Sequence, residues 1–203
     1  VDGSGVLPAL EPGAMLRVKD AATLMIIVSD NIATNMMIDY LGLERINQCI
    51  KALGCKDTAL YNPIHFEQYD RLGTSTPEDY ASIFIRLAKG ELISPGADEK
   101  MLDIFKKQHY NSMITKDFPP FYMDSDNTDD ILISVASKSG SMDACRNDGG
   151  LVFTPYGPYA IVMFHKEFSD AMYYPAHPAT VFGARVSRMI LDQFLALEGR
   201  FLK

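Results

Sequence analysis

The hydrophobic pattern of this 203-residue chain changes its period near residue 131, and this change constrains the fold more than any other feature. The run Ile131-Leu132-Ile133-Ser134-Val135-Ala136 is apolar and rich in β-branched residues, and two further apolar segments, 149–153 and 159–164, are bounded by Gly or Pro. Three such segments joined by short turns predict an antiparallel meander. Helical periods stand before the meander and after it, so we expect an α+β fold.

Apolar residues recur at helical spacing in several segments between about residues 20 and 109 and again near the C-terminus. One helix start is typical, because Thr76 precedes Pro77 and two acidic residues follow in the first turn. Residues 55–75 show no period and are predicted to form a long loop, a kind of segment that is usually functional. The expected helices cover about residues 20–28, 32–41, 43–53, 77–89, 95–109 and 179–197.

The composition is that of an acidic globular protein with enough apolar residues for one core. Because 26 acidic residues face 19 basic ones, the net charge of −7 repels a phosphate backbone and excludes nucleic acid as a partner. No apolar run approaches the ~18 residues of a membrane span. The first residues, Val1 to Gly5, carry neither the basic nor the apolar region of a secretory signal.

The cysteines and histidines show no spacing that is typical of a metal site. The three cysteines are odd in number and lack a Cys-x-x-Cys pattern. Cys49 and Cys55 lie close enough in sequence either to form a disulfide or to remain free thiols. The four histidines are scattered at positions 65, 109, 165 and 177. We therefore expect no metal and no cofactor.

Two short polar motifs stand in unusual surroundings. Ser29-Asp30-Asn31 interrupts an apolar helical stretch, where polar side chains are costly unless they are hydrogen-bonded. Lys138-Ser139-Gly140 follows the first predicted strand, and its glycine permits close approach of a ligand. The ordinary alternatives are a helix cap at Ser29 and a solvated lysine at a strand end. Ser125-Asp126-Asn127 repeats the first motif in an Asp-rich loop without apolar flanks, and we assign it no function.

The two motifs together resemble those of class A-like serine β-lactamases and penicillin-binding-protein-type serine hydrolases, which carry Ser-Asp-Asn, Lys-Thr-Gly and Ser-x-x-Lys. Residues 28–35, followed by Leu41-Gly42, are similar to the corresponding helix, and the segment Gly3-Ser4-Gly5-Val6-Leu7 is similar to the one before it. Arg146-Asn147-Asp148-Gly149-Gly150 resembles the turn into the next strand. The resemblance extends from about residue 3 to residue 195.

The resemblance implies a β-lactamase/transpeptidase-like fold, in which N- and C-terminal helices and a helical region pack on an antiparallel sheet. We expect a single domain over residues 1–203. Its helical region would cover residues 18–130, and the sheet with the closing helix would cover residues 131–203.

The resemblance also assigns roles to the two motifs. Ser29 would relay a proton to the leaving nitrogen of a β-lactam, beside the ammonium group of Lys138. Lys138 would attract the substrate carboxylate, and the Ser139 hydroxyl would hydrogen-bond to it. Asn31 would bind the acylamide side chain of the substrate, and Gly140 would let the substrate approach the strand.

Four further residues receive supporting roles from the resemblance. The backbone N–H of Ser141 would form half of an oxyanion hole. Asp30 would be structural and stabilise the turn, and Asn35 would stabilise the long loop. Arg146 would add positive charge for the carboxylate, or else serve as a turn residue that pairs with a neighbouring aspartate.

Two expected catalytic groups are missing from the pattern. The family nucleophile is a serine made reactive by a lysine one helical turn on, but no serine of this chain has a lysine three positions later. Since only residues 1–28 precede Ser29, we expect the nucleophile helix and the first strands to lie on an N-terminal segment outside this chain. The deacylating motif Glu-x-x-Leu-Asn is also absent. Glu67 is the nearest candidate base, with an ordinary surface glutamate as the alternative.

The expected function is that of a secreted or periplasmic β-lactamase-type serine hydrolase, associated with antibiotic resistance. It would form and hydrolyse an acyl-enzyme with a β-lactam amide, as a monomer without a cofactor, and this chain alone would be inactive. A D-Ala-D-Ala peptidase or esterase of the same superfamily is the first alternative. A non-catalytic module of the same fold, which binds a lactam-like or peptidoglycan-like ligand, is the second.

Overall fold

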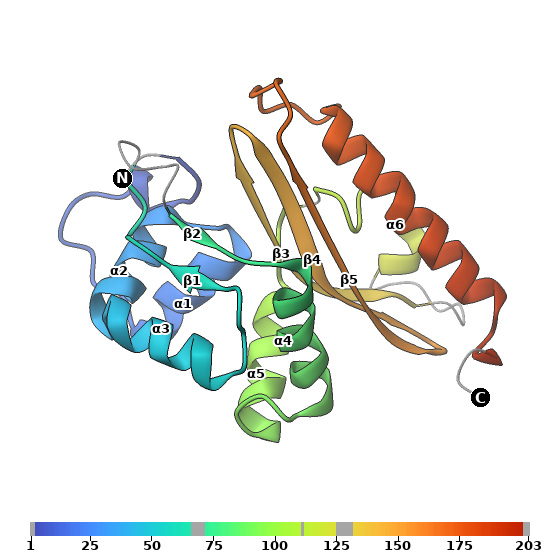
Figure 1. Cartoon of the computed structure of the whole chain (residues 1–203), viewed down its shortest axis with the longest axis horizontal. Coiled ribbons are helices and arrows are strands. Elements are labelled where there is room, and N and C mark those ends of the chain that lie inside the picture. The colour runs from blue at the N-terminus through green and yellow to red at the C-terminus, as the bar shows by residue number, and fades with distance from the viewer. Residues whose placement is uncertain (1–2, 66–71, 111, 125–131, 201–203) are drawn as a thin grey trace.

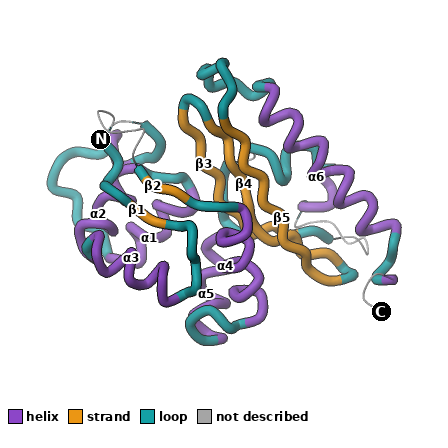
Figure 2. The backbone as a smooth tube through the Cα atoms, in the orientation of Figure 1, coloured by secondary structure: helices purple, strands orange, loops and turns teal. Residues whose placement is uncertain are grey.

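The computed structural model describes residues 3–65, 72–110, 112–124 and 132–200. A three-stranded antiparallel sheet has helices on both faces, and this arrangement confirms the predicted α+β class (Figures 1 and 2). The helices are α1 (Val18–Ile27), α2 (Asn31–Leu41), α3 (Leu43–Ala52), α4 (Pro77–Lys89), α5 (Pro95–Phe105) and α6 (Pro178–Ala196). The strands are β1 (Ala59–Leu60), β2 (Gly73–Thr74), β3 (Ser134–Met142), β4 (Cys145–Thr154) and β5 (Gly157–Lys166).

The strands of the main sheet are longer than the hydrophobic pattern predicts. β3 continues through Lys138-Ser139-Gly140, so this motif lies inside a strand and not after it. β4 already begins at Cys145, so Arg146 and its neighbours belong to a strand and not to a turn. The physical reason is that β4 pairs with β3 on one side and with β5 on the other. Its ladder of backbone hydrogen bonds therefore runs on across polar residues.

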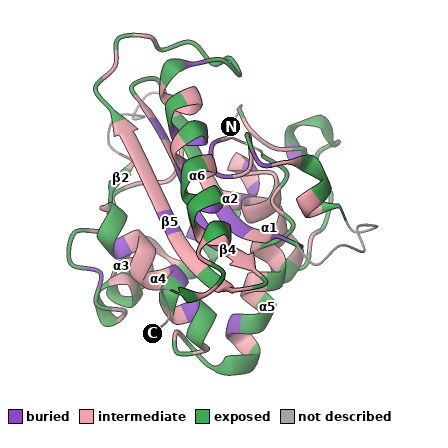
Figure 3. Ribbon diagram, turned by 90° about the vertical axis from the view of Figure 1, so that its right-hand side faces the viewer, coloured by how far each residue is buried: buried purple, intermediate pink, exposed green. Residues whose placement is uncertain are grey.

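The central strand β4 is buried on both faces, and Figure 3 shows how far each residue is covered. Val152 packs with Leu191 of α6 and with Ile133 on one side. Leu151 packs with Phe84 and other residues of α4 on the other side. Successive side chains of a strand point to opposite faces, so one strand joins two separate apolar clusters.

The predicted helix over residues 95–109 ends early, at Phe105, because the residues after it bind another helix. The Gln108 side chain donates to the carbonyl oxygen of Ile26 at 2.9 Å, and the backbone N–H of His109 donates to that of Ile27 at 2.9 Å. These carbonyl groups lie at the C-terminal end of α1, where no intrahelical partner exists. Gln108 and His109 therefore cap α1 instead of prolonging α5.

The three cysteines are free thiols, so the disulfide alternative is not realised. Cys49 is exposed, Cys55 is buried, and Cys145 is partly covered. Within the described ranges, no helix combines the length and the apolar character that crossing a bilayer requires. The same ranges hold no cluster of three or more His, Cys, Asp or Glu side chains arranged to bind a metal ion.

Candidate active site

Ser29 stands at the junction of α1 and α2 in an unusual backbone conformation. Its φ angle of 49° lies in the left-handed region, where few residues other than glycine are found. Such strain persists only where the surrounding structure holds it, and it gathers at functional sites. The contacts of the next residue, Asp30, show what holds it here.

The Asp30 carboxylate is fully buried and accepts three backbone hydrogen bonds. Its Oδ1 caps α2 through the N–H of Ala33 at 2.9 Å, and its Oδ2 accepts from Val6 at 2.7 Å and from Leu7 at 2.9 Å. Gly5, at a φ of 122°, lies so close that an added Cβ would stand 2.2 Å from Oδ2. One carboxylate thus ties the N-terminal segment to the Ser29 turn.

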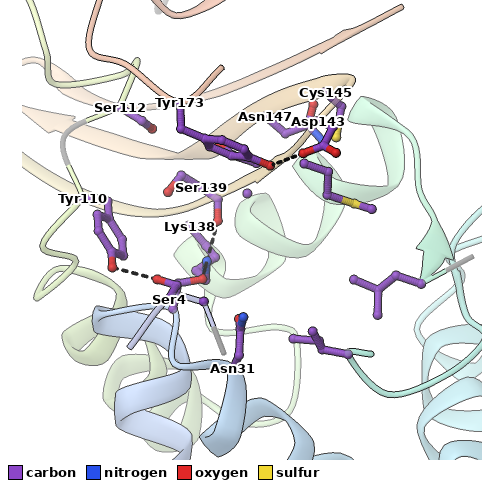
Figure 4. A pocket seen from close by; sticks show the side chains of 17 residues that line it. Ser4, Asn31, Tyr110, Ser112, Lys138, Ser139, Asp143, Cys145, Asn147 and Tyr173 are labelled. Atoms are coloured by element: carbon purple, nitrogen blue, oxygen red, sulfur yellow. Dashed lines mark hydrogen bonds between the residues drawn. The ribbon is translucent and has the colours of Figure 1, made fainter. Parts of the chain in front are cut away.

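Residues of the N-terminal segment also reach the site. The backbone N–H of Asn31 donates to the Ser4 carbonyl oxygen at 3.0 Å. The Ser4 hydroxyl donates to the Val28 carbonyl oxygen at 3.1 Å and lies 2.7 Å from the hydroxyl of Tyr110 (Figure 4). These contacts form one wall of the space in front of Ser29.

Lys138 of β3 meets Ser29 across 109 positions of sequence. Its Nζ donates a 2.8 Å hydrogen bond to the Ser29 hydroxyl oxygen and also contacts the carbonyl oxygen of Ser139. Burial lowers the pKa of Lys138 to about 8, because the charged form loses its hydration. The negative charge of Asp148 opposes this shift. Beneath the strand, the Tyr80 hydroxyl donates to the Lys138 carbonyl oxygen at 3.0 Å.

Asp148 of β4 is the buried acid beside this lysine. Its Oδ2 accepts hydrogen bonds from the Ser112 hydroxyl at 2.9 Å and from the backbone of Met113 and Ile114, each at 3.1 Å. Its Oδ1 is buried without a hydrogen-bond partner among the described residues. Burial raises the pKa of Asp148, and these hydrogen bonds, with one from the backbone of Gly149, oppose that shift. Asp148 therefore both fixes the backbone at residues 112–114 and supplies a negative charge that favours the Lys138 ammonium.

A pocket of about 840 Å³ opens in front of the Ser29–Lys138 pair. Lys138 and Ser139 of β3 line it together with Asn31 of α2 (Figure 4). Ile64 and Leu72 also line it. A Cβ atom added at Gly140 would meet no atom within 4 Å, so the strand presents open space to a ligand there. Six of the predicted site residues line this pocket: Ser29, Asn31, Lys138, Ser139, Gly140 and Ser141.

Arg146 is not brought to the pocket, whereas its neighbour Asn147 is. The guanidinium group is buried and donates to backbone carbonyl oxygens, including those of Cys145 at 2.8 Å and Met172 at 3.0 Å. Neither Asp143 nor Asp148 forms a salt bridge with it among the residues that the structure describes. Both sequence-based readings of Arg146, as a pocket cation and as the partner of an aspartate, therefore differ from its observed contacts.

The long loop is held at its start by Asn35. The Asn35 side chain donates to the Ile64 carbonyl oxygen at 2.9 Å and accepts from the Ile64 N–H at 2.8 Å. Glu67, the candidate base, lies outside the described residues. Of the described residues near this segment, Ile64 and Leu72 line the pocket.

Sequence reasoning missed several residues of the pocket. Asn147 lies opposite Gly140 in the observed register and points to the other face of β4 from Arg146, but the sequence contains no signal of that register. Tyr110, Ser112 and Tyr173 gave no local signal, since they lie in irregular segments that tertiary contacts alone bring to the site.

The fold and the paired motifs define a class A-like serine β-lactamase or penicillin-binding-protein-type architecture. Residues 1–194 match the β-lactamase enzyme family, and the chain belongs to that family. A β-lactamase from Sphaerobacter thermophilus DSM 20745 superposes with a TM-score of 0.80 and 29% identity, over 95% of this chain and 69% of that one. A search among curated proteins found no significant match.

Two further solved structures are similar to this chain. PBP-A, a mutant of which was solved as an acyl-enzyme complex with penicillin G, has a TM-score of 0.78 and 28% identity, over 97% of this chain and 69% of that one. A class A β-lactamase representative from Bacteroides cellulosilyticus DSM 14838 has a TM-score of 0.71 and 23% identity, over 85% of this chain and 62% of that one. The last comparison concerns the fold alone.

Proposed function

We propose that this chain is the larger part of a β-lactamase-type serine hydrolase, whose nucleophilic serine lies on a segment outside these 203 residues. The observation that carries the proposal is the 2.8 Å hydrogen bond from the half-buried Lys138 ammonium to the Ser29 hydroxyl, in a pocket lined by the β3 edge. A hydroxyl in this position relays a proton between a nucleophile and the leaving nitrogen of a lactam. General acid–base transfer of this kind contributes about 10²–10⁴-fold to rate.

The substrate would lie along β3. Its carboxylate would meet the Lys138 ammonium and the Ser139 hydroxyl, and its carbonyl oxygen would meet the N–H of Ser141. Asn31 would hold the acylamide group from the opposite side. Glu67 is proposed as the base that activates water for deacylation, because Ile64 and Leu72 bring both ends of its segment to the pocket. The family relationship supports a site of action outside the cytoplasm, where such hydrolysis confers antibiotic resistance.

The gene product that includes the upstream coding sequence tests this proposal. After incubation with penicillin G, we expect intact-protein mass spectrometry to show one added acyl mass, located on a serine of a Ser-x-x-Lys sequence. A folded full-length protein that gains no mass would contradict the hydrolase and favour the non-catalytic binding module.

A D-Ala-D-Ala peptidase or esterase is the second candidate. It is supported by the likeness to PBP-A, which is as strong as the likeness to the β-lactamase from Sphaerobacter, and by the absence of Glu-x-x-Leu-Asn. The two activities are distinguished by measuring hydrolysis of a chromogenic cephalosporin and of a D-Ala-D-Ala peptide by the same protein. Rapid turnover of the cephalosporin selects the lactamase, whereas a persistent acyl mass with peptide cleavage selects the peptidase.

Binding of a carboxylate-bearing lactam is expected to weaken as the pH rises through about 8, the pKa of Lys138. Below that pH the side chain is an ammonium group and attracts the carboxylate, and above it the proton and the attraction are lost. If only the charged form binds, affinity falls by about tenfold per pH unit above the pKa. Titration calorimetry between pH 6 and 10 measures this dependence.

Lys138→Met removes the titrating group. Its affinity for the lactam should be low and should no longer change with pH. Lys166→Met is the control, because Lys166 lies exposed at the end of β5 and pairs with Glu167. Affinity that stays constant to pH 10 in the wild-type protein would contradict the role of the Lys138 charge.

A further inference from the structure

The buried guanidinium group of Arg146 joins two segments that are distant in sequence. In the β3–β4 hairpin it contacts the carbonyl oxygens of Met142 and Cys145, the latter at 2.8 Å. In the segment after β5 it donates to Ala171 at 3.4 Å and to Met172 at 3.0 Å. A buried charge is costly unless hydrogen bonds replace its hydration. Arg146 therefore holds the segment around residue 172 against the hairpin.

Tyr173 is the residue that this arrangement presents to the pocket. Its ring centroid lies 4.3 Å from the Arg146 Cζ, within the range of a cation–π contact. Its hydroxyl donates to Asp143 Oδ1 at 3.1 Å, a bond drawn in Figure 4. The side chain lines the pocket, and the residue remains 57% exposed. Two contacts thus orient an aromatic ring that a ligand can still reach.

The register of the sheet places this ring relative to the substrate. Arg146 stands opposite Ser141, and Asp143 follows in the turn, so the ring lies at the C-terminal end of β3, beyond Ser141 as counted from Lys138. A substrate whose carboxylate lies at Lys138 and whose carbonyl oxygen lies at Ser141 directs its acyl side chain toward that end.

We propose that Tyr173 is a specificity-determining residue that packs against an aromatic or apolar acyl side chain of the substrate, and that Arg146 is a positioning residue that orients the Tyr173 ring. The ligand contact rests on the proposed function, whereas the positioning does not. An aromatic contact of this kind favours the matching substrate by about threefold to tenfold.

The ligand contact is tested by acylation rates in the gene product that carries the upstream segment. Penicillin G has a phenyl side chain, and 6-aminopenicillanic acid has none, so the ratio of their acylation rates isolates the side-chain contact. We expect Tyr173→Ala to lower this ratio threefold to tenfold and Tyr173→Phe to preserve most of it. Tyr40→Ala, at an exposed tyrosine of α2, is the control. An unchanged ratio in Tyr173→Ala would overturn the contact.

The positioning is tested without any acylation, through the thiol of Cys145. Cys145 precedes Arg146, is partly covered and lines the pocket together with Tyr173. The segment after β5 contacts the hairpin there through a 3.1 Å bond from the Glu167 N–H to the Ala144 carbonyl oxygen. We expect Arg146→Met to speed alkylation of Cys145 by iodoacetamide, measured by peptide mass spectrometry against the exposed Cys49. Arg146→Met should also lower the ratio of the acylation rates with penicillin G and 6-aminopenicillanic acid, as Tyr173→Ala does.

The remaining thiol and a second arginine supply the controls. Arg188→Met removes an exposed arginine that pairs with Asp192, and it should leave Cys145 unchanged. If Arg146→Met unfolds the protein, the buried Cys55 will be alkylated as well. In that case Tyr173→Ala is the variant that tests the positioning, and the expected result is faster alkylation of Cys145 while Cys55 stays protected. An unchanged Cys145 in both folded variants overturns the positioning. Failure of both lactams to acylate the wild-type protein overturns the proposed function and the ligand contact, while the alkylation result still decides the positioning.

Discussion

Replacing Ser29 by alanine is expected to slow acylation by penicillin G about 10²–10⁴-fold, the usual contribution of a positioned acid–base group. The hydroxyl is the group in the pocket that accepts the 2.8 Å hydrogen bond from Lys138, and alanine removes it without adding bulk. Stopped-flow mixing followed by mass spectrometry, on the gene product with its upstream segment, gives the rate of acylation.

Ser125→Ala is a matched control for this variant, because Ser125 opens the second Ser-Asp-Asn sequence of the chain. It should acylate at the wild-type rate. A Ser29→Ala protein that acylates within threefold of wild type would exclude Ser29 from the proton relay, and equal slowing of both variants would point to a general loss of structure.

Replacing Asp30 by alanine is expected to lower the free energy of unfolding by about 3–6 kcal/mol, since an unsatisfied buried donor costs about 1–3 kcal/mol. Three backbone N–H groups, of Val6, Leu7 and Ala33, lose their acceptor. The loss is a large share of the total stability of a typical domain. Urea denaturation followed by circular dichroism measures it.

Asp98 offers a comparison of equal chemistry at a different place. It is also fully buried and accepts from the backbone of Leu92, Ile93 and Ser94, before α5. Asp98→Ala should cost a similar free energy but leave lactam binding intact below the unfolding transition, whereas Asp30→Ala should weaken both. If Asp30→Ala lowers the free energy of unfolding by less than about 1 kcal/mol, Asp30 is not the residue that stabilises the Ser29 turn.

The sequence predicted the class of fold and the two motifs that meet in the site, because the fold class and each motif depend on residues that are close together in sequence. Hydrophobic period distinguishes a helix from a strand within about ten positions. The apolar segments 131–136, 149–153 and 159–164 were therefore sufficient to predict the meander. The polar break at Ser29-Asp30-Asn31 was sufficient to mark a turn between two helices.

The assignment of Arg146 shows where that reasoning stopped. A one-residue change of phase moves a strand side chain to the opposite face, and the phase of β4 depends on its pairing with β3 and β5. The residues around Arg146 contain no signal of that pairing. Only the folded sheet places Asn147 at the pocket and turns Arg146 toward the carbonyl oxygens of residues 171 and 172.

The sequence by itself therefore determined an acidic α+β chain of the β-lactamase enzyme family, with a serine motif and a lysine motif 109 positions apart. The tertiary structure alone decided that desolvation lowers the pKa of Lys138 to about 8, that Asp148 lies near enough to oppose that shift, and that Tyr110 and Tyr173 complete the pocket. The physical reason is that periodicity and capping act over a few residues. Desolvation, charge–charge interaction and strand register depend instead on groups that meet only when the chain has packed.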